Sequence, residues 1–177
     1  MKLAFKSPTN FEDRLICLGT LSKFCHVELV FDENELEILE MIDARKLRLI
    51  GSHFRDDYLC FSSLPSDGGT RFKWVDLSDP KIWTVIPAPP MVRDKDMSAA
   101  TIAGDFDGLS YDWMSIIGFV IPIGENNPAD RICSGMVYEE LVDEGMPEGK
   151  APWRVSPGAL YKAVVKLNAA VAKAVIP

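Results

Sequence analysis

Two short stretches, far apart in the chain, carry side chains that could do nucleophilic chemistry. The first is Cys25-His26-Val27-Glu28, and the second is Cys133-Ser134-Gly135. A cysteine attacks as a thiolate, which a neighbouring histidine can generate, and the histidine needs an acceptor that fixes its ring. The residue types therefore predict a cysteine hydrolase with Cys133 as nucleophile, His26 as general base and a third residue that orients the imidazole.

Glu28 is the first candidate for the third residue. It lies two positions after His26, so on a strand both side chains project from the same face. A residue on a neighbouring strand, such as Ser62, or an acidic residue between Glu35 and Asp43, would orient the ring equally well. The alternative interpretation of Glu28 is a solvated or hydrogen-bonded carboxylate at a strand edge.

Other residues compete for these roles. A cysteine on the apolar stripe of a helix is often a small buried hydrophobe, and this is the plain alternative for Cys133. His53 lies in a loop-like context where exposure is expected. Cys25 neighbours His26, but adjacent strand residues point to opposite faces, so we expect Cys25 in the core.

The first half of the chain is rich in strand patterns. Alternation predicts a strand over 24–31 that carries His26 and Glu28, and a hairpin of two strands whose turn contains Gly68 and Gly69. Residues 36–50 fit helical and strand spacing about equally. The predicted elements are an opening segment at 11–21, strands at 58–63, 70–77 and 81–86, and a helix at 94–106 with Asp96 or Ser98 as its cap.

The second half is predicted to be helical. Asn127 and Pro128 are typical of a helix start, and Gly145 and Pro147 of its end, which places Cys133 within the first two turns. Exposed amides and the helix dipole there would stabilise a thiolate. Ser156-Pro157 opens a last helix with one apolar face, which we interpret as structural.

Composition limits the function classes. The 177 residues are 47% hydrophobic and 25% charged, which predicts one globular domain over 1–177. A net charge of −7 gives no reason to bind nucleic acid or anionic lipid, and no stretch approaches a membrane span or a signal peptide. We expect a cytoplasmic or virion-associated protein with four reduced cysteines and no cofactor or metal.

Several segments together resemble a known family. They are His26-Val27-Glu28, Phe61-Ser62-Ser63, Asp67-Gly68-Gly69-Thr70-Arg71, Gly108-Leu109-Ser110-Tyr111-Asp112-Trp113, Cys133-Ser134-Gly135 and Ser156-Pro157-Gly158-Ala159-Leu160-Tyr161. In content and order they are similar to the circularly permuted NlpC-type, papain-like cysteine hydrolases related to YiiX and YaeF, which include phage-encoded members. In that permuted order, as here, the cysteine helix follows the histidine strand.

The resemblance implies an α+β fold, with a small antiparallel sheet or half-barrel packed on helices. It implies a peptidase or amidase that forms a thiol acyl-enzyme on an amide or ester, with cell-wall peptides as the first substrate class and lipid acyl groups as the second. Tyr111, Asp112 and Ser134 are expected to bind substrate. A different class stays open, namely a non-catalytic virion or interaction protein that keeps the fold with a decayed site.

Overall fold

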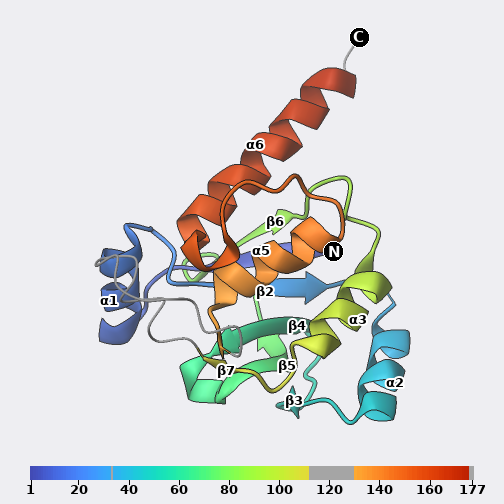
Figure 1. The fold of residues 1–177 in the computed structure, drawn as a ribbon. Coiled ribbons are helices and arrows are strands. Elements are labelled where there is room, and N and C mark those ends of the chain that lie inside the picture. Colours follow the sequence, from blue (N-terminus) through green and yellow to red (C-terminus); the bar gives the residue numbers. More distant parts are fainter. Residues whose placement is uncertain (33, 112–129, 176–177) are drawn as a thin grey trace.

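The fold is built around a six-stranded sheet (Figure 1). The structure is a computed structural model, and it describes residues 1–32, 34–111 and 130–175. The strand order is β3-β5-β4-β2-β1-β6, and a second, two-stranded sheet joins β7 to β8. The strands are β1 (Lys2–Lys6), β2 (His26–Phe31), β3 (Leu49–Ile50), β4 (Asp57–Leu64), β5 (Gly69–Asp76), β6 (Trp83–Pro87), β7 (Ser110–Tyr111) and β8 (Asp130–Arg131).

Helices connect and cover these strands. They are α1 (Phe11–Thr20), α2 (Glu35–Arg45), α3 (Asp96–Asp105), α5 (Cys133–Asp143) and α6 (Pro157–Val175), with short 3-10 helices η1 (Pro65–Asp67) and η2 (Pro152–Arg154). The α+β class is confirmed. The predicted succession of strands first and helices after is wrong, because α1 and α2 lie between strands of the sheet.

The sheet is mixed rather than purely antiparallel, which corrects the predicted sheet. β1, β2, β4, β5 and β6 pair antiparallel, whereas β3 pairs parallel with β5. β4 and β5 form a hairpin and therefore run in opposite directions. β3 joins the outer edge of β5 and runs opposite to β4, so it is parallel to β5. Helix α2 lies between β2 and β3 and lets the chain enter that edge in this direction.

The predicted β4–β5 hairpin is confirmed, and its turn depends on glycine. Gly68 and Gly69 have φ values of +76° and +113°. At Gly69 a Cβ atom would lie 1.9 Å from the carbonyl oxygen of Leu109, so no side chain fits. The turn thus brings the start of β5 against the segment before β7.

Strand β1 is the main element that the sequence analysis missed. It lies between β2 and β6, where its backbone pairs on both sides, and Leu3 and Phe5 are fully buried. The predicted strand 81–86 is confirmed as β6, which forms an edge of the sheet. That position tolerates Pro87, since an edge strand leaves backbone groups unpaired.

The helix predictions hold in part. In the stretch 36–50, which fitted helix and strand equally well, the structure has helix α2 up to Arg45. The predicted helix 94–106 is confirmed as α3. Neither Asp96 nor Ser98 caps α3, because its N-cap is Lys95 without a side-chain hydrogen bond. The carboxylate of Asp96 instead accepts from the backbone amide of Asp32, 3.0 Å away, and so ties α3 to the end of β2.

The main core lies between the sheet and the helices. Val27, Leu29 and Phe31 of β2 contribute to it together with Met136 and Val137 of α5. Figure 1 shows α5 running along β2, while the C-terminal half of α6 extends away from the sheet. The first turns of α6 are buried through Leu160 and Val164. No helix among the described residues is long and apolar enough to cross a membrane.

Candidate functional site

Cys133 is the first residue of helix α5, directly after the N-cap Ile132. This corrects the predicted start at Pro128: residues 130–131 form β8, and Asn127 and Pro128 lie outside the described residues. The first amides of a helix have no intrahelical acceptor and point outward, and the helix dipole favours negative charge beside them. The structure therefore places the thiol where a thiolate, and later an oxyanion, would be stabilised.

His26 is the first residue of β2, at the end of the sheet where α5 also begins (Figure 1). Its Nε2 atom lies 2.8 Å from Oε1 of Glu28, and the Cys133 sulfur is close enough to the imidazole to raise its pKa. With Nε2 taken by Glu28, Nδ1 is the ring nitrogen left for the thiol. The structure thus joins Cys133, His26 and Glu28 in one connected set.

The charges of this set support one another. Burial works against the imidazolium, but the negative charges of the Cys133 thiolate and the Glu28 carboxylate outweigh it and raise the pKa of His26 to about 9. Burial would likewise raise the pKa of Glu28, yet Arg71 and His26 hold it well below its usual range. A carboxylate beside an imidazolium is the charge state that a thiolate–imidazolium pair requires.

The other candidates for the third residue lie elsewhere. The hydroxyl of Ser62 donates to the backbone carbonyl of Val27, 2.6 Å away. The acidic residues between Glu35 and Asp43 belong to α2, which lies at the opposite end of the sheet from the start of α5 (Figure 1). Of the three alternatives, only Glu28 contacts the imidazole.

Arg71 is the residue at this site that the sequence analysis missed as a functional residue. Its guanidinium donates from Nη2 to Oε1 of Glu28 at 2.8 Å and from Nη1 to Oε2 at 3.0 Å. In the sequence, only the position of Arg71 in the Asp67–Arg71 segment of the family resemblance pointed to it. No local sequence pattern predicts that an arginine side chain reaches across a sheet. Arg71 is fully buried.

Gly135 brings α5 close to the segment before α6. A Cβ atom at this position would lie 2.9 Å from the carbonyl oxygen of Pro152 and 3.0 Å from Cγ1 of Ile132. Both contacts are closer than side chains normally tolerate. Glycine at this position therefore permits the start of α5 to pack directly against η2.

The predicted substrate-binding residues have different surroundings. The buried hydroxyl of Ser134 donates to the carbonyl of Val155 at 2.6 Å, which ties the start of α5 to the segment before α6. Tyr111 is half-buried on β7 and pairs in register with Arg131, two residues before Cys133. Asp112 lies outside the described residues. Substrate binding by these three residues stays a prediction.

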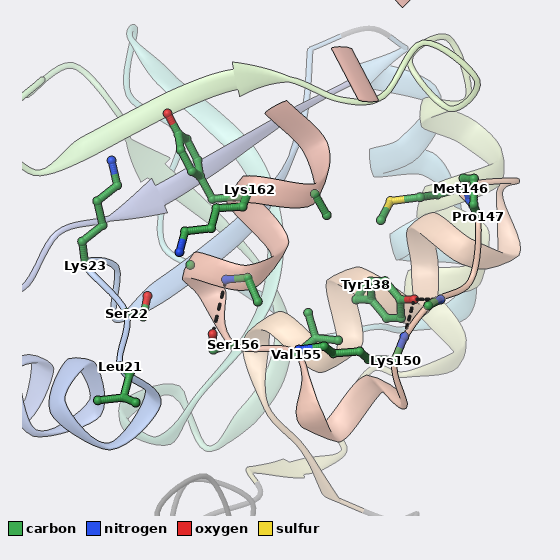
Figure 2. A pocket seen from close by; sticks show the side chains of 15 residues that line it. Leu21, Ser22, Lys23, Tyr138, Met146, Pro147, Lys150, Val155, Ser156 and Lys162 are labelled. Carbon is green, nitrogen blue, oxygen red and sulfur yellow. Dashed lines mark hydrogen bonds between the residues drawn. The ribbon is translucent and has the colours of Figure 1, made fainter. Parts of the chain in front are cut away.

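A mostly apolar cavity of about 770 Å³ lies along the start of α6, and Cys133, His26 and Glu28 are not among its lining residues (Figure 2). Its link to them is indirect: Val155, which accepts from Ser134, lines it, and so does Lys23, three residues before His26. Figure 2 shows Lys23 and Lys162 toward one side of the cavity and Lys150 near Tyr138. The cavity thus combines apolar walls with three lysines, and no Asp or Glu is among its lining residues.

Cys133 and His26 are themselves almost closed off, with only 3% and 5% of their surface exposed. Cys25 is buried in the core, as predicted, and the four cysteines are free thiols. Among the described residues, no group of three or more His, Cys, Asp or Glu side chains is placed to hold a metal ion.

The functional conclusion rests on the arrangement of Cys133, His26 and Glu28. Comparison of the chain with known protein families finds no matching family model, and comparison with curated proteins finds no significant match.

Proposed function

We propose that the protein is a cysteine hydrolase that cleaves an amide or ester through a thiol acyl-enzyme. The observation that carries the proposal is the group of residues at the start of α5: a thiol at a helix N-terminus, beside an imidazole that is hydrogen-bonded to a buried carboxylate. Each member supplies what the next requires, since the carboxylate favours the imidazolium and the imidazolium favours the thiolate.

The chemistry follows from these positions. The Cys133 thiolate attacks the substrate carbonyl carbon, forms a carbon–sulfur bond and pushes the carbonyl electrons onto oxygen. Backbone amides at the start of α5 are the donors for that oxyanion. The His26 imidazolium then gives its proton to the leaving amine or alcohol as the scissile bond breaks. In the second half, His26 takes a proton from water, which attacks the thioester and releases the acid and the Cys133 thiolate.

The neighbouring cavity suits the apolar part of a substrate. Its volume is in the range of small-ligand sites, and its lysines favour a ligand with negative charge. Cell-wall peptides are the first substrate class because the family resemblance implies them. An acyl chain would fit the apolar walls as well, so a thiol acyltransferase or lipid ester hydrolase is the related alternative.

A second candidate function is a non-catalytic interaction protein, which could be part of a virion. Helix α1 favours it, because Phe11, Leu15 and Leu18 are exposed along one side of the helix, and Leu21 is exposed directly after it. Exposed apolar residues at this spacing are typical of a helix that binds a partner. The near closure of Cys133 from solvent points the same way.

Thiol reactivity separates the two functions. Iodoacetamide alkylation of the four cysteines is followed by peptide mass spectrometry between pH 5 and 9, in the native protein and in His26→Ala. A hydrolase predicts that Cys133 alone reacts below pH 7 and loses this reactivity in His26→Ala, because the imidazolium holds the thiolate. A Cys133 that stays inert contradicts the hydrolase and favours the interaction protein.

Turnover of peptide, amide and ester substrates completes the test. Cys133→Ala should abolish it while the protein keeps its secondary structure by circular dichroism. Cys17→Ala is the matched control, since Cys17 is a half-buried thiol on α1 and should leave turnover unchanged. Unchanged turnover in Cys133→Ala would refute the assigned nucleophile.

A further inference from the structure

Behind Glu28 the buried charges continue across the sheet. Glu28 lies on β2 and Arg71 on β5, and β4 separates the two strands. Ser62 of β4 stands opposite Arg71 in the register, and its small side chain turns toward the Val27 carbonyl. Arg71 can therefore extend over Ser62 and reach Glu28 from two strands away.

The contact between Arg71 and Glu28 is bidentate. Two guanidinium nitrogens meet the two carboxylate oxygens at 2.8 and 3.0 Å, and Oε1 is the same atom that receives Nε2 of His26. A paired arrangement of this kind fixes the plane of the carboxylate as well as its distance. The orientation of Glu28 toward His26 is thus set by Arg71.

Arg71 is in turn held from its other side. Its Nε donates to Oδ2 of Asp67 at 2.7 Å, and Nζ of Lys73 lies 3.1 Å from both oxygens of that carboxylate. The charged groups therefore alternate in sign from the thiolate through His26, Glu28, Arg71 and Asp67 to Lys73. Only the outer members, Asp67 and Lys73, reach the surface to any extent.

We propose that Arg71 is a positioning residue that acts through Glu28 on His26, and that Asp67 fixes Arg71 in this role. The inference rests on the proposed function, since it concerns how the thiolate–imidazolium pair is maintained. Arg71 is fully buried and its hydrogen bonds go to Glu28 and Asp67, so it could instead serve folding alone, and the two roles make different predictions.

The test compares Arg71→Lys with Asp67→Asn. Lysine keeps the positive charge but cannot donate two parallel bonds, so Glu28 stays ionised and loses its orientation. Asp67→Asn leaves Arg71 paired with Glu28 and removes the charge on its far side. We expect the rate of Cys133 alkylation at pH 6 to fall about tenfold or more in Arg71→Lys and less in Asp67→Asn. The acidic limb of the rate profile should move to higher pH in both variants.

Arg45→Lys is the matched control. Arg45 forms an exposed pair with Asp105 on α2 and α3, away from His26, so this variant should keep the native alkylation profile. Circular dichroism and thermal unfolding establish that each variant is folded. If Arg71→Lys does not fold, Asp67→Asn carries the test, because its site is nearer the surface.

The outcomes separate the two proposals. If native Cys133 reacts below pH 7 in a His26-dependent way and both folded variants keep the native profile, the positioning role is refuted while the hydrolase stands. The positioning role is also refuted if Arg45→Lys shifts the alkylation profile as much as Arg71→Lys does, because the shift would then not depend on the contact with Glu28. If native Cys133 is inert, the proposed function fails first, and the positioning role fails with it.

Discussion

Glu28→Gln tests whether the carboxylate sets the charge of His26. Glutamine keeps the shape of the side chain and removes its charge. In the native protein the pKa of His26 is raised from 6.5 to about 9, which at roughly 1.4 kcal/mol per pKa unit favours the imidazolium by roughly 3 to 4 kcal/mol. Burial works against this shift, so the two anions, Cys133 and Glu28, together contribute more than that amount.

Loss of Glu28 has two effects of the same sign. The imidazolium loses a hydrogen-bonded anion 2.8 Å away, and the buried Arg71 loses one of its two carboxylate partners and keeps Asp67. A guanidinium that is less fully neutralised disfavours a second positive charge nearby. We therefore expect the pKa of His26 to fall by at least about one unit, and Cys133 alkylation at pH 7 to slow about tenfold.

The assay is an NMR titration of the His26 imidazole in the native protein and in Glu28→Gln. Adding Arg71→Met to Glu28→Gln should raise the pKa of His26 again, because the positive charge nearest to the imidazole is removed. An unchanged His26 midpoint in Glu28→Gln would refute the assignment of Glu28 as the orienting residue.

Three further predictions concern stability and substrate. Burial, with Glu144 and Asp143 nearby, raises the pKa of Glu140 to about 9. Between pH 4.5 and about 9 the carboxyl is therefore protonated in the folded protein and ionised in the unfolded chain. In this range the free energy of unfolding falls by roughly 1.4 kcal/mol for each unit by which the pH rises. Glu140→Gln should flatten that part of the profile in urea unfolding, and an unchanged slope would contradict a buried neutral carboxyl. Gly135→Ala should lower the free energy of unfolding by about 1 kcal/mol, because crowding of the new methyl group against Pro152 outweighs the higher helix propensity of alanine. A more stable variant would show that α5 can move away from Pro152. Ala163→Trp should fill the cavity and raise KM more than it changes kcat, whereas unaltered kinetics would exclude the cavity from substrate binding.

The sequence alone predicted the elements whose signals are local. Alternating side chains marked β2, glycines at positive φ marked the β4–β5 turn, and Ser156-Pro157 marked the start of α6. Cys133 and His26 were likewise accessible as candidates for a reactive pair, because a thiol and an imidazole have few roles and the chain contains only two histidines. The two-residue period of a strand made Glu28 the first candidate for the third residue, with Ser62 and the acidic residues of 35–43 as alternatives.

Only the tertiary structure decided the contacts between distant segments. It chose Glu28 over Ser62 as the partner of His26, because the serine hydroxyl is taken by the Val27 carbonyl. It placed Arg71 against Glu28 across β4, moved the start of the cysteine helix to Cys133 and inserted β1 between β2 and β6. Each of these outcomes depends on strand order and register, which are set by the packing of the whole sheet. Local periodicity determines which way a side chain points, but strand order and register determine which side chain it meets.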